Sequence, residues 1–348
     1  MKRLWRKAIA ASFCAFGALT FTVGCSTSDT NSANSSSGAS GANQPSGNSN
    51  TVKQTGNSKL TFYVIAHSGP SDPFWAVEQK GVQAAAKDLG VKAIFEGPQT
   101  FSIPDEVNLL NAAIAAKPAG IAVTLPDPKA FNESIKQAQA HGIPVISFNA
   151  QDFSKSVPVK GYVGQDETQS GDFLASHLLN QLHSGDHTVI LNSQPGALNL
   201  TWRERGIEQV LKPKGVAVDV LNIGTDANQA ISILQSYFAK HPNVDLIFSL
   251  GPQETIPAVQ FLKQNNLQDK VKIASFDIDP NTLHAIQQGI DLGTVDQQPF
   301  VQAYMSVVEL YLTAKYGMSP VDVNTGTLFV TKDNVSKMEK LVQSGIGG

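Results

Sequence analysis

The chain alternates short, continuous apolar runs with longer segments in which apolar residues recur every three or four positions. Ile121–Leu125 (IAVTL) is typical of the short runs, and it lacks the alternation of a strand with one wet face. Such runs are typical of strands covered by helices on both faces of a sheet. The longer segments have the period of amphipathic helices. Val82, Ala85 and Leu89 share one face, for example, before Gly90 ends that segment.

The two kinds of segment follow each other along most of the chain. The predicted strands are Leu60–Ala66, Val91–Glu96, Ile121–Leu125, Ile143–Phe148, Thr188–Asn192, Val216–Leu221, Val244–Leu250, Val271–Phe276, Gly293–Val295 and Thr327–Val330. The predicted helices are Pro73–Leu89, one that opens at Pro104, Phe131–Ala140, Thr168–Leu182, Thr201–Leu211, Ala227–Lys240, Glu254–Asn265, Asn281–Gln288 and Val301–Tyr316. This alternation predicts an α/β fold of parallel sheets with right-handed crossovers, arranged as two doubly wound lobes.

The amino-terminal segment has the features of a secretion signal. Four basic residues in the first seven precede an uncharged, mostly apolar run, Ala8–Val23, which is short for a membrane span. The run ends at Gly24-Cys25, which resembles the lipobox of bacterial lipoproteins, although Thr22 replaces the usual large aliphatic residue. We therefore expect a signal peptide at 1–24 and lipidation of Cys25.

Residues 26–58 are mainly Ser, Asn, Gly, Thr and Gln. Such a composition cannot bury enough apolar surface to offset its ordering entropy, so we expect 25–58 to be a lipidated cysteine and a disordered tether. The protein would then lie on the outer face of the cytoplasmic membrane, attached only by its lipid.

Composition excludes several classes of protein. Of the 2 cysteines, Cys14 lies in the signal and Cys25 at the anchor, which leaves no thiol for catalysis or a zinc site. The net charge is −3 and no basic cluster follows the signal, so a nucleic-acid partner is not expected.

Polar and aromatic side chains gather just after the predicted strands. Ligands of doubly wound sheets bind outside the carboxyl ends of the strands, and often between two lobes. The candidates are Asp72, Phe74, Trp75, Asn149, Asn199, Arg203, Asp277 and Gln297. Carboxylates, carboxamides and a guanidinium can bind hydroxyl groups, and aromatic rings can cover the C–H face of a sugar. The mixture of charges disfavours a phosphate or carboxylate ligand.

Four stretches in this order make the chain similar to the ribose/galactose type of periplasmic binding proteins. They are Asp72-Pro-Phe-Trp75, Gly142-Ile-Pro-Val-Ile-Ser-Phe-Asn149, Arg203-Glu-Arg-Gly206, and Phe276-Asp277 with Gln297-Gln-Pro299. The resemblance implies the type I fold, with hinge crossings near Gly164–Asp166, Gln297–Pro299 and Thr325–Thr327. One lobe would contain 59–165 and 298–326, and the other 166–297 and 327–343.

The resemblance also implies roles. Asp72 would bind ligand hydroxyls, Phe74 and Trp75 would stack on the ligand, and Arg203, Asp277 and Gln297 would bind it from the other lobe or the hinge. A monomer would capture a neutral sugar or polyol and deliver it to the permease of an ATP-binding-cassette (ABC) importer. We expect no enzymatic activity, catalytic residue or cofactor.

Two departures leave the ligand open. Asn149-Ala150 replaces the usual Asp-Arg pair, and Gly251-Pro252 replaces a frequent Asn-Asp. These changes are compatible with a linear polyol or a small unusual sugar as well as with an ordinary pentose or hexose.

Other interpretations also remain. Phe74 and Trp75 could be core residues, Asp72 only a helix cap, and Arg203 a surface residue, while His67 is expected to be structural. A sensory binding protein that presents a signal molecule to a membrane receptor is the main alternative function. A sugar-responsive repressor would need an N-terminal helix-turn-helix, but the signal and tether occupy that place. A glycoside hydrolase could use Asp72 and Asp277 as its carboxylate pair, but it would need an acid of raised pKa in an apolar pocket, which a sequence does not show.

No metal site is expected from the sequence. The spacing of His177, His183 and His187 does not place them on one helical face, and Asp277-x-Asp279-x-Asn281 lacks the Gly and Glu of a calcium loop.

Overall fold

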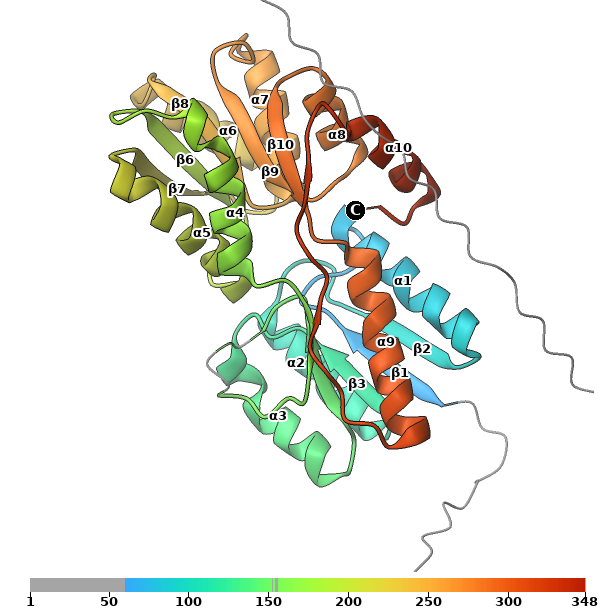
Figure 1. Ribbon diagram of the computed structural model, residues 1–348. Coiled ribbons are helices and arrows are strands. Elements are labelled where there is room, and N and C mark those ends of the chain that lie inside the picture. Colours follow the sequence, from blue (N-terminus) through green and yellow to red (C-terminus); the bar gives the residue numbers. More distant parts are fainter. Residues whose placement is uncertain (1–59, 152, 154–155, 348) are drawn as a thin grey trace, which may run out of the picture. The chain divides into compact units, whose positions relative to one another are not determined.

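The computed structural model describes residues 60–151, 153 and 156–347 (Figure 1). The predicted signal peptide (1–24), the lipidated Cys25 and the tether (25–58) lie outside the described residues. Within the described part of the chain, none of the helices combines the length and the apolar character that crossing a membrane requires.

Two six-stranded sheets form the framework. The first has the order β11-β5-β4-β3-β1-β2 and the second β12-β10-β9-β8-β6-β7. The first contains β1 (Thr61–Ile65), β2 (Lys92–Glu96), β3 (Gly120–Val123), β4 (Val145–Phe148), β5 (Tyr162–Gly164) and β11 (Val323–Asn324). The second contains β6 (His187–Asn192), β7 (Ala217–Asn222), β8 (Val244–Ser249), β9 (Lys272–Phe276), β10 (Asp291–Asp296) and β12 (Leu328–Val330). The pairings are parallel except that β12 runs antiparallel to β10, so two parallel-sheet α/β lobes are confirmed.

Helices cover both faces of each sheet. Those of the first lobe are α1 (Pro73–Leu89), α2 (Ile103–Ala115), α3 (Pro128–Ala140) and α9 (Pro299–Tyr316). Those of the second are α4 (Glu167–Leu178), α5 (Leu198–Leu211), α6 (Ala227–Lys240), α7 (Pro252–Gln264), α8 (Pro280–Gln287) and α10 (Val335–Ser344), with 3-10 turns at Leu179–Gln181 and Lys212–Lys214. In β1, Val64 and Ile65 point into different core clusters, which explains why this strand is continuously apolar.

The ends of α1 follow the sequence prediction. Asp72 accepts a hydrogen bond from the backbone N–H of Phe74, and Gly90 ends the helix with φ of 66°. The sequence assignment missed β5, β11 and α10. The first two are only 3 and 2 residues long, too short for a hydrophobic period to be visible.

The chain passes between the two sheets three times, after β5, after β10 and after β11 (Figure 1). Each lobe is therefore built from separate segments of the chain. Since the central strands of both sheets are parallel, the loops that follow them collect at one edge of each sheet.

Candidate ligand-binding site

A cavity that opens to solvent lies between loops of the two lobes, and the empty space in it and at its mouth is about 390 Å³. All eight predicted residues line it. The first lobe supplies Asp72, Phe74, Trp75 and Asn149, and the second, with the segment that leaves β10, supplies Asn199, Arg203, Asp277 and Gln297. Their common location follows from the parallel topology, because each lies at the carboxyl end of a strand or at the start of the next helix. Their part in binding stays a prediction.

Asn149 and Asp277 occupy similar positions in the two lobes. Each directly follows a buried strand that ends in Phe, and each has left-handed backbone, with φ of 56° and 71°. Asn and Asp adopt this conformation more readily than most side chains. Gln297 links them, because its Nε2 donates to Asp277 Oδ1 at 2.7 Å and its Oε1 accepts from Asn149 Nδ2 at 3.4 Å. A chain of hydrogen bonds therefore connects the ends of β4 and β9.

Asp72 has two structural partners. Its Oδ1 caps α1 by accepting from the backbone N–H of Phe74 at 3.0 Å, and its Oδ2 accepts from Nε2 of Gln253, on α7 of the second lobe, at 2.7 Å. Asp72 is therefore a helix cap and also a contact between the lobes.

Arg203 is a buried residue rather than a surface one, with 2% exposure. Its Nε donates to Glu167 Oε2 at 2.5 Å, its Nη1 donates to the carbonyl of Leu250 at 2.8 Å, and the guanidinium lies 4.5 Å from the ring centre of Phe276. Glu167 compensates the positive charge. One nitrogen, Nη2, remains for another partner.

Phe74 and Trp75 belong to the core cluster of the first sheet and also line the cavity. The Trp75 ring meets those of His67 and Phe74 edge to face, with centroids 4.7 and 4.9 Å apart. These neighbours hold the indole at the cavity wall. Phe74 and Trp75 are therefore both core residues and cavity residues.

Three carboxyl groups at the cavity have raised pKa values. Burial is the main cause and raises the pKa to about 6 for Asp72, about 7 for Glu254 and about 8 for Asp277. For Asp277, the charge of Arg203 and the hydrogen bond from Gln297 oppose the effect of burial. At neutral pH, Asp277 is mostly protonated and the Arg203–Glu167 pair is neutral overall, whereas Asp72 is mostly ionised and Glu254 about half ionised, so the site carries a small negative charge.

Among the buried polar side-chain atoms that have no hydrogen-bond partner in the described part of the chain are Asn149 Oδ1, Asn199 Oδ1 and Arg203 Nη2. All three residues line the cavity. Buried polar atoms are normally satisfied, so two acceptors and one donor of this kind match the hydroxyl groups of a bound solute.

Sequence reasoning missed four polar members of the cavity wall: Ser193, Gln194, Gln253 and Glu254. The last two directly follow Gly251-Pro252 at the end of β8. Their position after a strand is the signal that could have identified them, because ligands of such sheets bind outside the carboxyl ends of the strands. His67, which was expected to be structural, also lines the cavity. Its Nδ1 lies 2.9 Å from Thr124 Oγ1, and burial lowers its pKa to about 3, so that the ring is neutral.

Comparisons with known proteins agree with this architecture. A family model described as periplasmic binding protein domain matches residues 62–317. The xylose/arabinose-binding protein XylF of Sulfolobus acidocaldarius is 30% identical over 280 residues, which cover 76% of this chain and 69% of that protein.

Two solved structures extend the comparison. A carbohydrate transporter from Acidothermus cellulolyticus in complex with myo-inositol is 32% identical, with a TM-score of 0.75 and coverage of 83% of this chain and 100% of that one. A periplasmic sugar-binding protein of an ABC sugar transporter from Legionella pneumophila is 33% identical, with a TM-score of 0.74 and coverage of 77% and 100%.

Proposed function

The chain belongs to the family of periplasmic binding proteins, and from this premise we propose that it captures a neutral sugar or polyol outside the cell and delivers it to an ABC importer. The observation that carries the proposal is the cavity itself. Its wall combines Trp75 and Phe74 with carboxyl, carboxamide and guanidinium groups, and three of the polar wall residues have a buried atom without a hydrogen-bond partner in the described part of the chain. A neutral molecule with many hydroxyl groups complements such a wall.

The named ligands of relatives support the same class. XylF is a xylose/arabinose-binding protein, and the Acidothermus structure holds myo-inositol. This chain has Asn149-Ala150 and Gly251-Pro252 where a charged pair and an Asn-Asp pair are common in the family, so fewer groups of fixed charge meet the ligand. Cyclic and linear polyols are therefore candidate solutes, as are pentoses and hexoses.

Reversible solute binding, without a chemical reaction, accounts for the arrangement of the cavity between the two lobes. A ligand that contacts both lobes favours the closed form, since it binds that form more tightly than the open one, and the permease then recognises the closed form. The protein works as a monomer on the outer face of the cytoplasmic membrane, where the lipid on Cys25 holds it near the importer, and it turns over no substrate.

The test is calorimetry of the purified protein with myo-inositol, D-xylose, L-arabinose, D-ribose, D-glucose and xylitol, with amino acids and a sugar phosphate as comparison solutes. Micromolar binding of one of the neutral sugars or polyols, with one site per chain, supports the proposal. Binding confined to amino acids, sugar phosphates or metal ions contradicts it.

Transport and sensing are separated in cells. Deletion of the gene should abolish high-affinity uptake of the solute identified by calorimetry. Normal uptake together with a lost transcriptional response to that solute would instead indicate the sensory function.

A further inference from the structure

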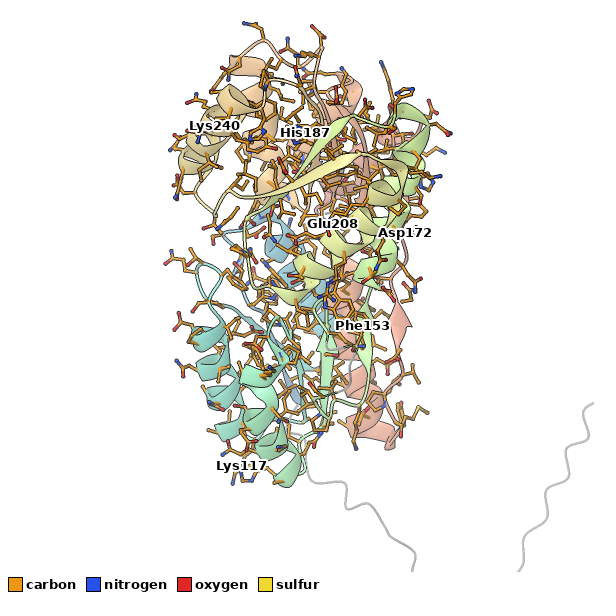
Figure 2. All side chains as sticks on the ribbon, turned by 90° about the vertical axis from the view of Figure 1, so that its left-hand side faces the viewer. Lys117, Phe153, Asp172, His187, Glu208 and Lys240 are labelled. Carbon is orange, nitrogen blue, oxygen red and sulfur yellow. The ribbon has the colours of Figure 1, made fainter. Side chains whose placement is uncertain are left out.

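A second cluster of polar side chains, which could bind a metal ion, lies at the edge of the second sheet opposite to the cavity. His187, Asp219 and His241 each offer one metal-ligating atom, and these atoms all lie within 4.8 Å of one another. All three residues are partly buried. Figure 2 shows His187 in the same part of the second lobe as Lys240, the last residue of α6.

The topology explains why the three residues meet. His187 is the first residue of β6, and Asp219 of β7 pairs with Val189, so the side chains of His187 and Asp219 lie on the same face of the sheet. Val189 packs in one cluster with Phe238 of α6, which places the end of that helix over this face. His241, the residue that follows α6, therefore arrives beside the two strand residues.

Hydrogen bonds already hold two of the side chains together. His187 Nε2 lies 2.9 Å from Asp219 Oδ2, and the hydroxyl of Tyr237 donates to the same carboxylate oxygen at 2.7 Å. The backbone N–H of His187 donates to Asp245 Oδ2 at 2.9 Å, which fixes the start of the strand. The ring of Tyr237 stacks on that of His241 with centroids 4.4 Å apart. The Tyr237 hydroxyl also lies 3.3 Å from His187 Nε2, so Tyr237 contacts all three candidate ligands.

We propose that His187, Asp219 and His241 bind a divalent transition-metal ion of the zinc class, with water as the fourth ligand. Two imidazole nitrogens and one carboxylate oxygen are a common set of three protein ligands for Zn²⁺. Bonds of about 2.0–2.1 Å at tetrahedral angles bring ligand atoms to roughly 3.3 Å from one another. The candidate atoms lie within 4.8 Å of one another, so metal binding would bring them closer together by up to about 1.5 Å.

Two features of the surroundings favour a cation. The carbonyl end of α6, which carries a partial negative charge, lies at His241. Tyr237 holds the carboxylate of Asp219 by a hydrogen bond, as outer partners of metal ligands commonly do. The neighbouring Lys240 is the nearest basic residue in sequence, and its side chain is exposed to solvent rather than buried with the cluster.

The site is independent of the solute cavity. His187 opens β6, whereas Asn192 ends it at the cavity edge of the sheet, and five residue steps along a strand span about 17 Å. The ion would join β6, β7 and α6, so its effect is on the stability of the second lobe rather than on solute recognition. Metal bound only to the folded state raises the melting temperature.

The experiment is a titration of the metal-free, full-length protein with Zn²⁺ against a chromophoric chelator. Wild type should bind one equivalent of Zn²⁺ per chain and melt at a higher temperature with it. His187→Ala and His241→Ala should each weaken binding at least about 100-fold, and Tyr237→Phe about 10-fold. The control variants His177→Ala and His183→Ala should bind as wild type does, and solute affinity should be the same in all five variants.

X-ray absorption of the wild-type protein with one equivalent of Zn²⁺ provides a readout that does not depend on the folding of variants. Two imidazole ligands with two oxygen ligands at about 2.0–2.1 Å are expected. The proposal is overturned if wild type binds no Zn²⁺ at millimolar concentration, if the spectrum lacks two imidazoles, or if His187→Ala and His241→Ala bind with wild-type affinity.

Discussion

Gln253 donates a hydrogen bond from Nε2 to Oδ2 of Asp72 at 2.7 Å, and this bond joins the second lobe to the first at the cavity. The other carboxylate oxygen of Asp72 caps α1. A single side chain therefore connects the start of a helix in one lobe with the opposite lobe. Both residues also line the cavity, so closure and solute binding depend partly on the same groups.

Gln253→Ala removes this contact. Because hydrogen bonds to charged groups contribute about 1.5–3 kcal/mol, we expect the variant to favour the open form and to lose about 10-fold or more in solute affinity. Small-angle scattering should give a larger radius of gyration than wild type without solute and the same radius at saturation. Gln260→Ala, an exposed position on the same helix, is the matched control. Equal radii for Gln253→Ala and wild type without solute would contradict a closing role.

Arg203 should have separable roles in stability and in binding. Removal of one partner of a buried ion pair leaves the other charge uncompensated, so Arg203→Met should lower the free energy of unfolding by about 3–5 kcal/mol. Combining it with Glu167→Leu should restore most of that loss, because no unpaired charge remains.

Solute affinity should not recover with stability. Both the single and the double variant lack Arg203 Nη2, and both should bind the solute about 10- to 100-fold more weakly than wild type, as expected when a charged hydrogen-bond donor is lost. Urea denaturation and calorimetry measure the two quantities, and the exposed Arg205→Met is the control. A double variant with wild-type affinity would show that Arg203 serves the fold alone.

Trp75 provides an optical probe of the cavity. It and Trp202 are the tryptophans of the described part of the chain, and only Trp75 lines the cavity. Solute should change the emission of wild type and of Trp202→Phe but not of Trp75→Phe. Loss of the larger aromatic face should also weaken affinity about 10-fold. A solute-dependent change that survives in Trp75→Phe and disappears in Trp202→Phe would move the binding site elsewhere.

The pKa of Asp72, raised by burial to about 6, predicts a pH dependence of binding. Above pH 6 the carboxylate accepts hydrogen bonds from solute hydroxyls, and below pH 6 protonation removes an acceptor. Affinity should therefore fall as the pH is lowered from 7 to 5, by at most about tenfold per pH unit.

Asp72→Asn should bind weakly and should lose the part of the dependence centred near pH 6, while any part due to Glu254, whose pKa is about 7, is kept. Asp226→Asn is the control, because Asp226 also caps a helix but lies outside the cavity lining. A wild-type affinity that rises between pH 7 and pH 5 would mean that the protonated form of Asp72 binds the solute.

Much of the site was predictable because the parallel topology and the strand-end rule act together. Phe276-Asp277 and Phe148-Asn149 are far apart in the chain, yet both end strands whose carboxyl edges face the cavity. The start of α1 was equally predictable, since Asp followed by Pro is a favoured start of a helix.

What the sequence could not reveal are pairings between distant segments. Nothing near Arg203 in sequence indicates that Glu167 neutralises it, and the contact depends on how α4 packs against α5. The cluster of His187, Asp219 and His241 draws on two strands and a helix end, so the spacing of histidines along the chain carried no signal for it.

The central claim is that both lobes enclose a neutral, hydroxyl-rich solute between them. A crystal structure of the protein grown with the tightest-binding neutral solute tests it most directly. The account predicts density for one solute molecule in the cavity, against the Trp75 ring and within hydrogen-bond distance of Asp72, Arg203 and Asp277. Solute density at another place, or a structure in which these three polar side chains point away from one another with no cavity between the lobes, would contradict it.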